Sequence, residues 1–247
     1  MTFELESAAP AIRPRLSEVV LDHIKEKILS GALRPGDELP SESELANAFK
    51  VSKPTVRDAL RHLSVMGLVE IRQGCPSTIS RISPETLSQI FRFAIAGAKH
   101  RFKDIIEIRR AIECLAAPAA AINITNSEIE ELNEIVEKLK CSKNKYDKWV
   151  VWDVSFHRLI ATASGNALLP FLMDSLRGLI EAEMLALYTR KTLRDPEKTF
   201  QRHLALANAI TEHDPILALK LMEEHFDASQ TLVAAQDDNF EYRMLKK

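Results

Sequence analysis

The sequence has few glycines, few cysteines and no long apolar run. Its 247 residues include seven glycines and three cysteines, and Cys75, Cys114 and Cys141 lack the CxxC spacing typical of zinc-thiolate or redox sites. No stretch of about 18 apolar residues is available to cross a membrane, and the first residues lack the basic start and apolar core of a secretory signal. We therefore expect a cytoplasmic protein with reduced thiols and no membrane segment.

The scarcity of glycine and the 3.6-residue spacing of apolar residues predict a mainly α protein. The chain is 46% hydrophobic and 28% charged, which is typical of a folded globular protein. Ser83 and Pro84 suit the cap and the first position of a helix, so a domain boundary is expected there. We predict a loose arm over residues 1–14, a first domain over 15–82 and a second domain over 83–247.

Two short helices joined by a sharp turn are predicted in the first domain. Ser41 and Glu44 have the spacing of a capping box, which starts a helix that runs to about Phe49. Ser52 can cap the next helix, because Pro54 then falls in the first turn, where a missing N–H costs nothing. An earlier helix is expected to bury one stripe of side chains, made of Leu16, Val19, Val20, Ile24 and Ile28.

The second of these helices has an apolar face and a cationic face. Its apolar face consists of Val56, Ala59, Leu60 and Leu63. Lys53, Arg57 and Arg61 recur every four residues on another face. Such a face is often merely solvated, but two expected strands follow, over 69–72 and 78–81, as in a winged helix-turn-helix domain that binds DNA. The net charge of −2 does not indicate DNA binding, so this prediction depends on where the cations lie.

Short motifs extend this pattern over residues 15–80. They include Gly31, Pro35-Gly36, Leu39-Pro40-Ser41-Glu42, Val51-Ser52 and Pro54-Thr55-Val56-Arg57. In these motifs the sequence resembles the GntR family of bacterial transcription regulators. The resemblance implies a homodimer that binds a pseudo-palindromic operator in double-stranded DNA, more often as a repressor than as an activator. The DNA-binding residues that it implies are Ser52, Lys53, Thr55, Arg57, Arg61, Gln73 and Gly74.

Three positions depart from that family's usual pattern. Ser43 and Lys53 stand where arginine is common, and Cys75 stands where glycine is common in the wing. Lysine is a point charge without the planar fork of arginine, so bidentate reading of guanine should weaken at Lys53. We expect an altered operator sequence rather than a loss of DNA binding.

The second domain is predicted to be an all-α bundle of about seven helices. Four residues are candidate helix N-caps, namely Asn126, Asn166, Asp195 and Asp214. Asp153 and His157 are four residues apart on the inward face of one expected helix. His203 and His225 lie on apolar faces of two later helices. Each of these four residues alone is most simply explained as a core residue whose polar atoms are hydrogen-bonded. The four together indicate a metal site with three histidines and one aspartate.

The same positions, in the motifs DVSFH, TFQRHLALANAI and LMEEHF, resemble the FCD domain of the FadR-type branch of the GntR family. The resemblance implies that Asp153, His157, His203 and His225 bind a metal. It also implies that Arg109, in the motif EIRRAIE, contacts the effector. Arg109 is expected on an inward stripe with Ile105, Ile108, Ile112 and Leu115. The alternative is an ordinary i, i+4 ion pair between Arg109 and Glu113.

These ligands suit a divalent metal ion, with zinc first and nickel, manganese or iron(II) also compatible. A metal with open positions would accept a carboxylate, and Arg109 could bind a second acid group, so the expected effector is a small carboxylic acid. A metal sensor without an organic effector is the second interpretation. A metal-dependent enzyme fused to a DNA-binding module is the last, because no further carboxylate has the HExxH-type spacing of a general base.

Overall fold

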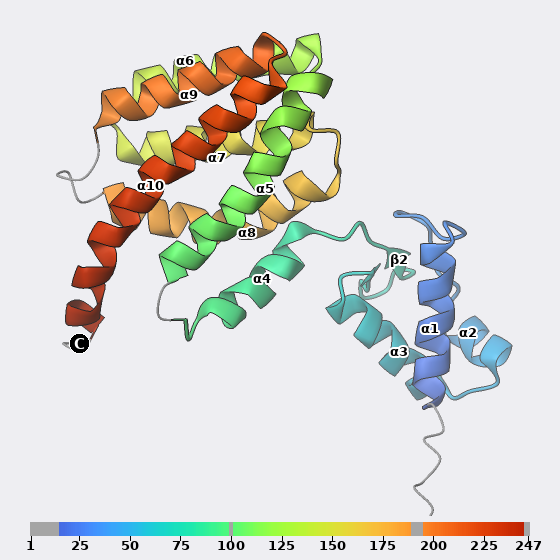
Figure 1. Ribbon diagram of the computed structural model, residues 1–247. Coiled ribbons are helices and arrows are strands. Elements are labelled where there is room, and N and C mark those ends of the chain that lie inside the picture. Colours follow the sequence, from blue (N-terminus) through green and yellow to red (C-terminus); the bar gives the residue numbers. More distant parts are fainter. Residues whose placement is uncertain (1–14, 99–100, 189–194, 245–247) are drawn as a thin grey trace, which may run out of the picture. The chain divides into compact units, whose positions relative to one another are not determined.

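A computed structural model describes residues 15–98, 101–188 and 195–244, and the chain divides after Thr86 into two units (Figure 1). The expected arm over residues 1–14 lies outside the described residues. The fold is mainly α, as predicted.

The N-terminal unit is a helix-turn-helix with a small wing. Its elements are α1 (Leu16–Leu29), α2 (Glu42–Phe49), α3 (Lys53–Val65), β1 (Val69–Glu70) and β2 (Thr78–Ile79). The capping box that starts α2 is present, because Oγ of Ser41 accepts from the backbone N–H of Glu44 at 3.3 Å and the Glu44 carboxylate accepts from the Ser41 N–H at 2.8 Å. Ser52 caps α3 through the N–H of Thr55 at 3.3 Å. Both predicted helix starts are therefore confirmed.

The core of this unit is formed by α1, α2, α3 and both strands of the wing. All four residues of the predicted apolar face of α3 are buried. The predicted stripe of α1 is partly wrong, because Leu16 and Val19 are 60% and 45% exposed. The buried side chains of α1 are Ser17, Val20, Leu21 and Ile24, which leaves those two residues at the solvent edge of the helix.

The wing strands are shorter than predicted. β1 and β2 pair antiparallel with Val69 opposite Ile79, and each contains two residues. The turn begins earlier than expected, because the N–H of Cys75 bonds to the carbonyl of Arg72 at 3.3 Å and Gly74 has a φ of +78°. Pro76 has no N–H to donate to a longer ladder.

The C-terminal unit contains seven helices within the described residues, in agreement with the prediction. They are α4 (Pro84–Ile95), α5 (Arg101–Asn123), α6 (Asn126–Ser142), α7 (Tyr146–Ala163), α8 (Leu168–Tyr188), α9 (Pro196–Thr211) and α10 (Pro215–Met244). α5 packs against α7, α8, α9 and α10, and it runs beside α10 in Figure 1. In the described part of the chain, each helix is too short or too polar to cross a membrane.

Three of the four predicted caps of this unit are confirmed. Side chains of Asn166, Asp195 and Asp214 accept hydrogen bonds from amides in the first turns of α8, α9 and α10, at 3.1, 3.0 and 2.9 Å. The prediction at Asn126 is wrong. Thr125 is the cap of α6, because its Oγ1 accepts from the N–H of Glu128 and the Glu128 carboxylate accepts from the Thr125 N–H at 2.9 Å.

The buried face of α5 also differs from the predicted stripe. Ile105 and Ile112 are buried, but Ile108 and Leu115 are 53% and 60% exposed. The buried face instead continues through four alanines, which are Ala116, Ala117, Ala120 and Ala121. Small side chains allow neighbouring helices to approach closely, and the bulkier residues beside them are left at the surface.

Candidate functional site

Three histidines from three helices meet in the core of the C-terminal unit. His157 on α7 and His203 on α9 are fully buried, and His225 on α10 is 7% exposed. One ring nitrogen of each lies within 4.8 Å of the others, and the ring centroids are 4.8 to 5.5 Å apart. Residues that are separated by up to 68 positions in the sequence thus form one cluster, as the apolar faces of their helices predicted.

Asp153 lies against this cluster, one turn before His157 on α7. Its Oδ1 is 3.0 Å from Nε2 of His203, and its Oδ2 is 3.8 Å from Nε2 of His157. Burial raises the pKa of Asp153, but the hydrogen bond with His203 and the nearby His157 and Arg109 outweigh this effect and hold the pKa well below its ordinary value. Asp153 is therefore a buried carboxylate anion.

The hydrogen bonds of His203 indicate a cation at this place. Nδ1 of His203 lies 2.8 Å from the carbonyl oxygen of Thr199, which can only accept, so Nδ1 carries a proton. Nε2 of the same ring faces the Asp153 carboxylate, which also can only accept. A bare lone pair on Nε2 would be repelled by the carboxylate. The contact therefore requires either a second proton, on Nε2, or a metal ion that both groups bind.

Several buried polar atoms around the cluster also fit a metal. Among the described residues, none hydrogen-bonds to Nε2 of His157, Nδ1 of His225 or Oδ2 of Asp153. Burial, with a smaller effect of the neighbouring His203 and His157, lowers the pKa of His225 well below its usual range, so this ring is neutral and can donate a lone pair. Three imidazoles and a carboxylate around one point are a donor set suited to a divalent transition metal.

Arg109 on α5 lies in the same buried region. It is 3% exposed, its guanidinium lies 5.6 Å from the centre of the Phe226 ring, and its Nη1 is 3.8 Å from the sulfur of Met184. Its Nε donates to Oε1 of Glu113 at 2.7 Å. The predicted i, i+4 pair therefore exists, but both partners are buried rather than on the surface.

Glu113 is the residue of this site that sequence reasoning missed. It is fully buried, and its Oε2 pairs with Nδ1 of His157 while its Oε1 binds Arg109. Burial raises the pKa of Glu113, but Arg109 and His157, which both contact its carboxylate, more than compensate and lower it. The i, i+4 spacing from Arg109 was visible in the sequence, whereas the contact with His157 on α7 was not.

The predicted DNA-binding residues of α3 lie on its exposed side, with one unforeseen partner. Lys53, Arg57 and Arg61 are all exposed. Arg57 is bound by Glu42 of α2, with Nη2–Oε2 2.6 Å and Nε–Oε1 3.0 Å. Ser52 and Thr55 are joined at the start of the helix, with 2.8 Å between their hydroxyl oxygens.

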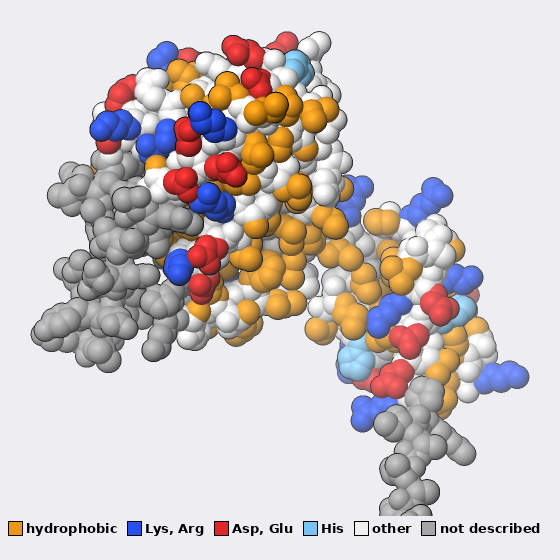
Figure 2. Space-filling view, viewed as in Figure 1, with side chains coloured by type: hydrophobic (Ala, Val, Ile, Leu, Met, Phe, Trp, Pro, Cys, Tyr) orange, Lys and Arg blue, Asp and Glu red, His pale blue; other side chains and the backbone are white. Residues whose placement is uncertain are grey.

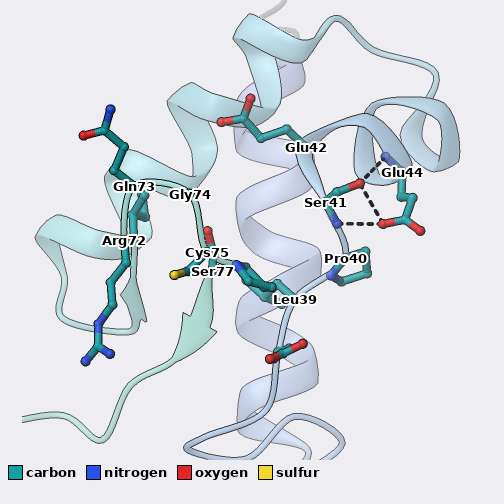
Figure 3. Close-up of a pocket in the computed structure, with 13 residues that line it drawn as sticks. Leu39, Pro40, Ser41, Glu42, Glu44, Arg72, Gln73, Gly74, Cys75 and Ser77 are labelled. Atoms are coloured by element: carbon teal, nitrogen blue, oxygen red, sulfur yellow. Dashed lines mark hydrogen bonds between the residues drawn. The ribbon is translucent and has the colours of Figure 1, made fainter.

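The remaining predicted DNA contacts, Gln73 and Gly74, lie in the wing. They line an open cleft of about 810 Å³ between the wing and the start of α2 (Figure 3). Arg72 lines the same cleft and is bound by Glu70, at 2.8 and 3.1 Å. The wing and α3 thus each present an arginine paired with a glutamate.

Comparison with known proteins identifies both units. The model of the gntR family of bacterial regulatory proteins matches residues 16–79, and the model of the FCD domain matches residues 104–228. The transcriptional regulator LutR of Bacillus subtilis is 30% identical over 203 residues, covering 80% of this chain and 92% of LutR. The transcriptional repressor NanR of Klebsiella aerogenes is 30% identical over 223 residues, covering 87% of this chain and 84% of NanR.

A solved structure agrees with these sequence matches. The GntR protein of Streptococcus agalactiae superposes with a TM-score of 0.68 at 27% identity, covering 87% of this chain and 99% of that protein. The two proteins thus share a fold over most of this chain. The chain belongs to the gntR family of bacterial regulatory proteins, a family of DNA-binding transcription regulators rather than of enzymes, and it carries the C-terminal FCD domain of the FadR-type branch.

Proposed function

We propose that this regulator is a cytoplasmic repressor that binds its operator as a homodimer and is released by a small organic acid. In this proposal residues 15–82 bind DNA, and residues 83–247 bind a metal and the effector. Repression is supported by the similarity to NanR of Klebsiella aerogenes, whose name describes a repressor. The observation that carries the effector part is the buried cluster of three histidines and an aspartate beside Arg109.

The proposed metal ligands are Asp153, His157, His203 and His225. Their donor atoms include nitrogens and an oxygen that accept no hydrogen bond from any described residue. Burying such atoms without a cation would destabilise the folded protein. Zinc is the first choice, and nickel, manganese and iron(II) are compatible with the same ligands. A metal held by four protein ligands can supply Lewis acidity to a carboxylate at a further coordination position.

Arg109 is the proposed contact for the effector's second acid group. A buried guanidinium binds a carboxylate through two parallel hydrogen bonds, and it remains charged at any physiological pH. Metal and arginine together favour a ligand with two acid groups, or with an acid and a hydroxyl group. We therefore infer a dicarboxylate, tricarboxylate, hydroxy acid or sugar acid.

The proposed DNA-binding surface consists of the N-terminal half of α3 and the wing. Lys53, Thr55 and Arg57 occupy the first turns of α3, the part of a recognition helix that reaches base edges in the major groove. Arg61 lies one turn later, where contact with the phosphate backbone is expected. Ser52 at the helix start, together with Gln73 and Gly74 of the wing, completes the set.

Dimerisation is supported by an apolar stripe on α5. Ile108, Leu115 and Ile122 recur every seven residues and are 53%, 60% and 66% exposed. Figure 2 shows hydrophobic side chains gathered along the face of the C-terminal unit that carries α5. An exposed stripe of this kind marks a protein contact, and a two-fold dimer would supply the two helix-turn-helix units that a pseudo-palindromic operator requires.

Release from DNA is the direct test of the proposed function. Genomic fragments retained by the purified protein are sequenced, and the best-bound fragment is labelled for fluorescence anisotropy. Small carboxylic acids are then added with and without a chelator. We expect one class of acid to release the DNA only in the untreated protein. Release by added metal alone would support a metal sensor, and an acid effect that persists in chelator would contradict the proposed site.

The dimer is tested separately by sedimentation. Leu115→Glu places a charge in the centre of the α5 stripe and should give a monomer. Ile216→Glu is the matched control, because Ile216 is an 83% exposed apolar residue of the same unit outside α5. A Leu115→Glu protein that remains dimeric would remove this face from the interface.

A further inference from the structure

One carboxylate joins the proposed effector contact to the proposed metal ligands. Glu113 on α5 accepts from Nε of Arg109 through Oε1 at 2.7 Å, and its Oε2 pairs with Nδ1 of His157 on α7. All three side chains are at most 4% exposed. Each oxygen of this carboxylate thus has a different partner, in a region from which water is largely excluded.

The contact with Glu113 determines which nitrogen of His157 can bind a metal. A carboxylate can only accept, so the ring nitrogen that faces it must carry the proton. That nitrogen is Nδ1, and Nε2 is left with its lone pair. Nε2 is the atom that faces Asp153, at 3.8 Å from its Oδ2.

His203 is held in the same tautomer by a different acceptor. Its Nδ1 donates to the carbonyl of Thr199 at 2.8 Å, within its own helix. The two rings thus present Nε2 to Asp153, one at 3.0 Å and one at 3.8 Å. Thr199 contributes a backbone atom that no substitution removes, whereas Glu113 contributes a side chain that can be changed.

We infer that Glu113 is a positioning residue that holds His157 in the metal-binding tautomer and links it to Arg109. The inference rests on the metal site of the proposed function. Outer carboxylates of this kind fix the orientation of a ligating histidine and increase its basicity, and their loss typically weakens metal affinity roughly 10- to 100-fold.

The link to Arg109 adds a coupling between the two sites. An acid that binds the Arg109 guanidinium must share it with Oε1 of Glu113, and this changes how firmly Oε2 holds His157. Because such coupling is reciprocal, a change at Arg109 must alter the affinity for metal. Replacing Arg109 with lysine keeps the charge but removes the fork that binds Glu113, so metal affinity should fall even without any acid present.

The experiment measures zinc affinity of the full-length protein by competition with a chromogenic chelator. We expect Glu113→Gln to bind zinc roughly 10- to 100-fold more weakly, and Arg109→Lys to bind it more weakly by a smaller factor. The matched control is Glu107→Gln, since Glu107 is an exposed residue of α5 that pairs with Lys103 at 3.8 Å. Circular dichroism verifies that each variant is folded.

Nitrogen NMR of the unmodified protein, labelled with ¹⁵N-histidine, provides a test that needs no buried variant. With zinc bound, Nδ1 of His157 should have the chemical shift of a protonated nitrogen and Nε2 that of a metal-bound nitrogen. Zinc on Nδ1, or full zinc affinity in Glu113→Gln, would overturn the positioning role and leave the metal site intact. If the unmodified protein binds no zinc, both the inference and the proposed metal site fail.

Discussion

The guanidinium of Arg57 is bound by the carboxylate of Glu42, with two parallel hydrogen bonds of 2.6 and 3.0 Å between α3 and α2. The hydrogen bond from Arg57 lowers the pKa of Glu42, so the carboxylate remains charged at neutral pH. Both side chains are partly exposed, at 51% and 36%. Glu42 thus occupies two guanidinium nitrogens of the arginine that is proposed to read DNA.

Replacing Arg57 with alanine tests whether this side chain reads a base. A bidentate arginine contact with guanine contributes specificity, so operator affinity should fall about 10- to 100-fold and the preference at one base position should relax. The measurement is anisotropy on the operator and on a set of single-base variants. An equal loss on every sequence would make Arg57 a phosphate contact instead.

Replacing Glu42 with glutamine should have the opposite effect. Removing the competing negative charge frees Arg57 for phosphate, and affinity for random-sequence DNA should rise roughly two- to fivefold, because exposed ion pairs are weak. Glu70→Gln in the wing is the informative comparison, since Glu70 holds Arg72 in the same way. Weaker binding by the Glu42→Gln protein would mean that Glu42 orients Arg57 rather than competes for it.

A pair of neighbouring substitutions tests the start of α6. Thr125→Ala removes the side chain that accepts from the N–H of Glu128, and should lower the free energy of unfolding of the C-terminal unit by about 1 kcal/mol. Asn126→Ala should change it little, because Asn126 is inside the helix. Both tryptophans, Trp149 and Trp152, lie in α7, so urea unfolding followed by tryptophan fluorescence reports on this unit. Equal effects of the two substitutions would contradict the assigned cap.

Removing one proposed metal ligand tests the cluster. His203→Ala should reduce the metal content of the purified protein, measured by mass spectrometry, while its circular dichroism spectrum stays helical. His62→Ala is the control, because His62 is an exposed histidine on α3. Unchanged metal content in the His203→Ala protein would remove this residue from the site.

Features determined by local sequence were predictable. The capping box of Ser41 and Glu44 and the apolar face of α3 depend on residues within one or two turns, so they could be read directly. The histidine cluster was also predictable, because each of its members lies on the apolar face of its own helix. The cap at Thr125 was missed although Glu128 follows three residues later, which is the capping-box signal.

Contacts between helices could not be predicted in the same way. The pairs of Glu113 with His157 and of Glu42 with Arg57 each join two helices, and their formation depends on how those helices cross. Periodicity shows which face of a helix is buried but not which residue it meets. The exposure of Leu115 has a related cause, because in the second half of α5 the alanines at 116, 117, 120 and 121, rather than Leu115, are buried in the core.

In the proposed function a small acid binds this protein through a metal in the C-terminal unit. The most direct measurement is a thermal-unfolding screen of small carboxylic acids, with and without a chelator, followed by tryptophan fluorescence. Trp149 is a suitable probe, because its ring lies 5.4 Å from that of His203. A ligand at about 100 times its Kd adds ~2.7 kcal/mol to the free energy of unfolding, which corresponds to a shift of several degrees.

We expect one class of acid to raise the unfolding temperature of the untreated protein and to have no effect once the chelator has removed the metal. A stabilising acid that acts equally well in chelator would contradict the claim. So would a protein that is stabilised by metal alone and by none of the acids.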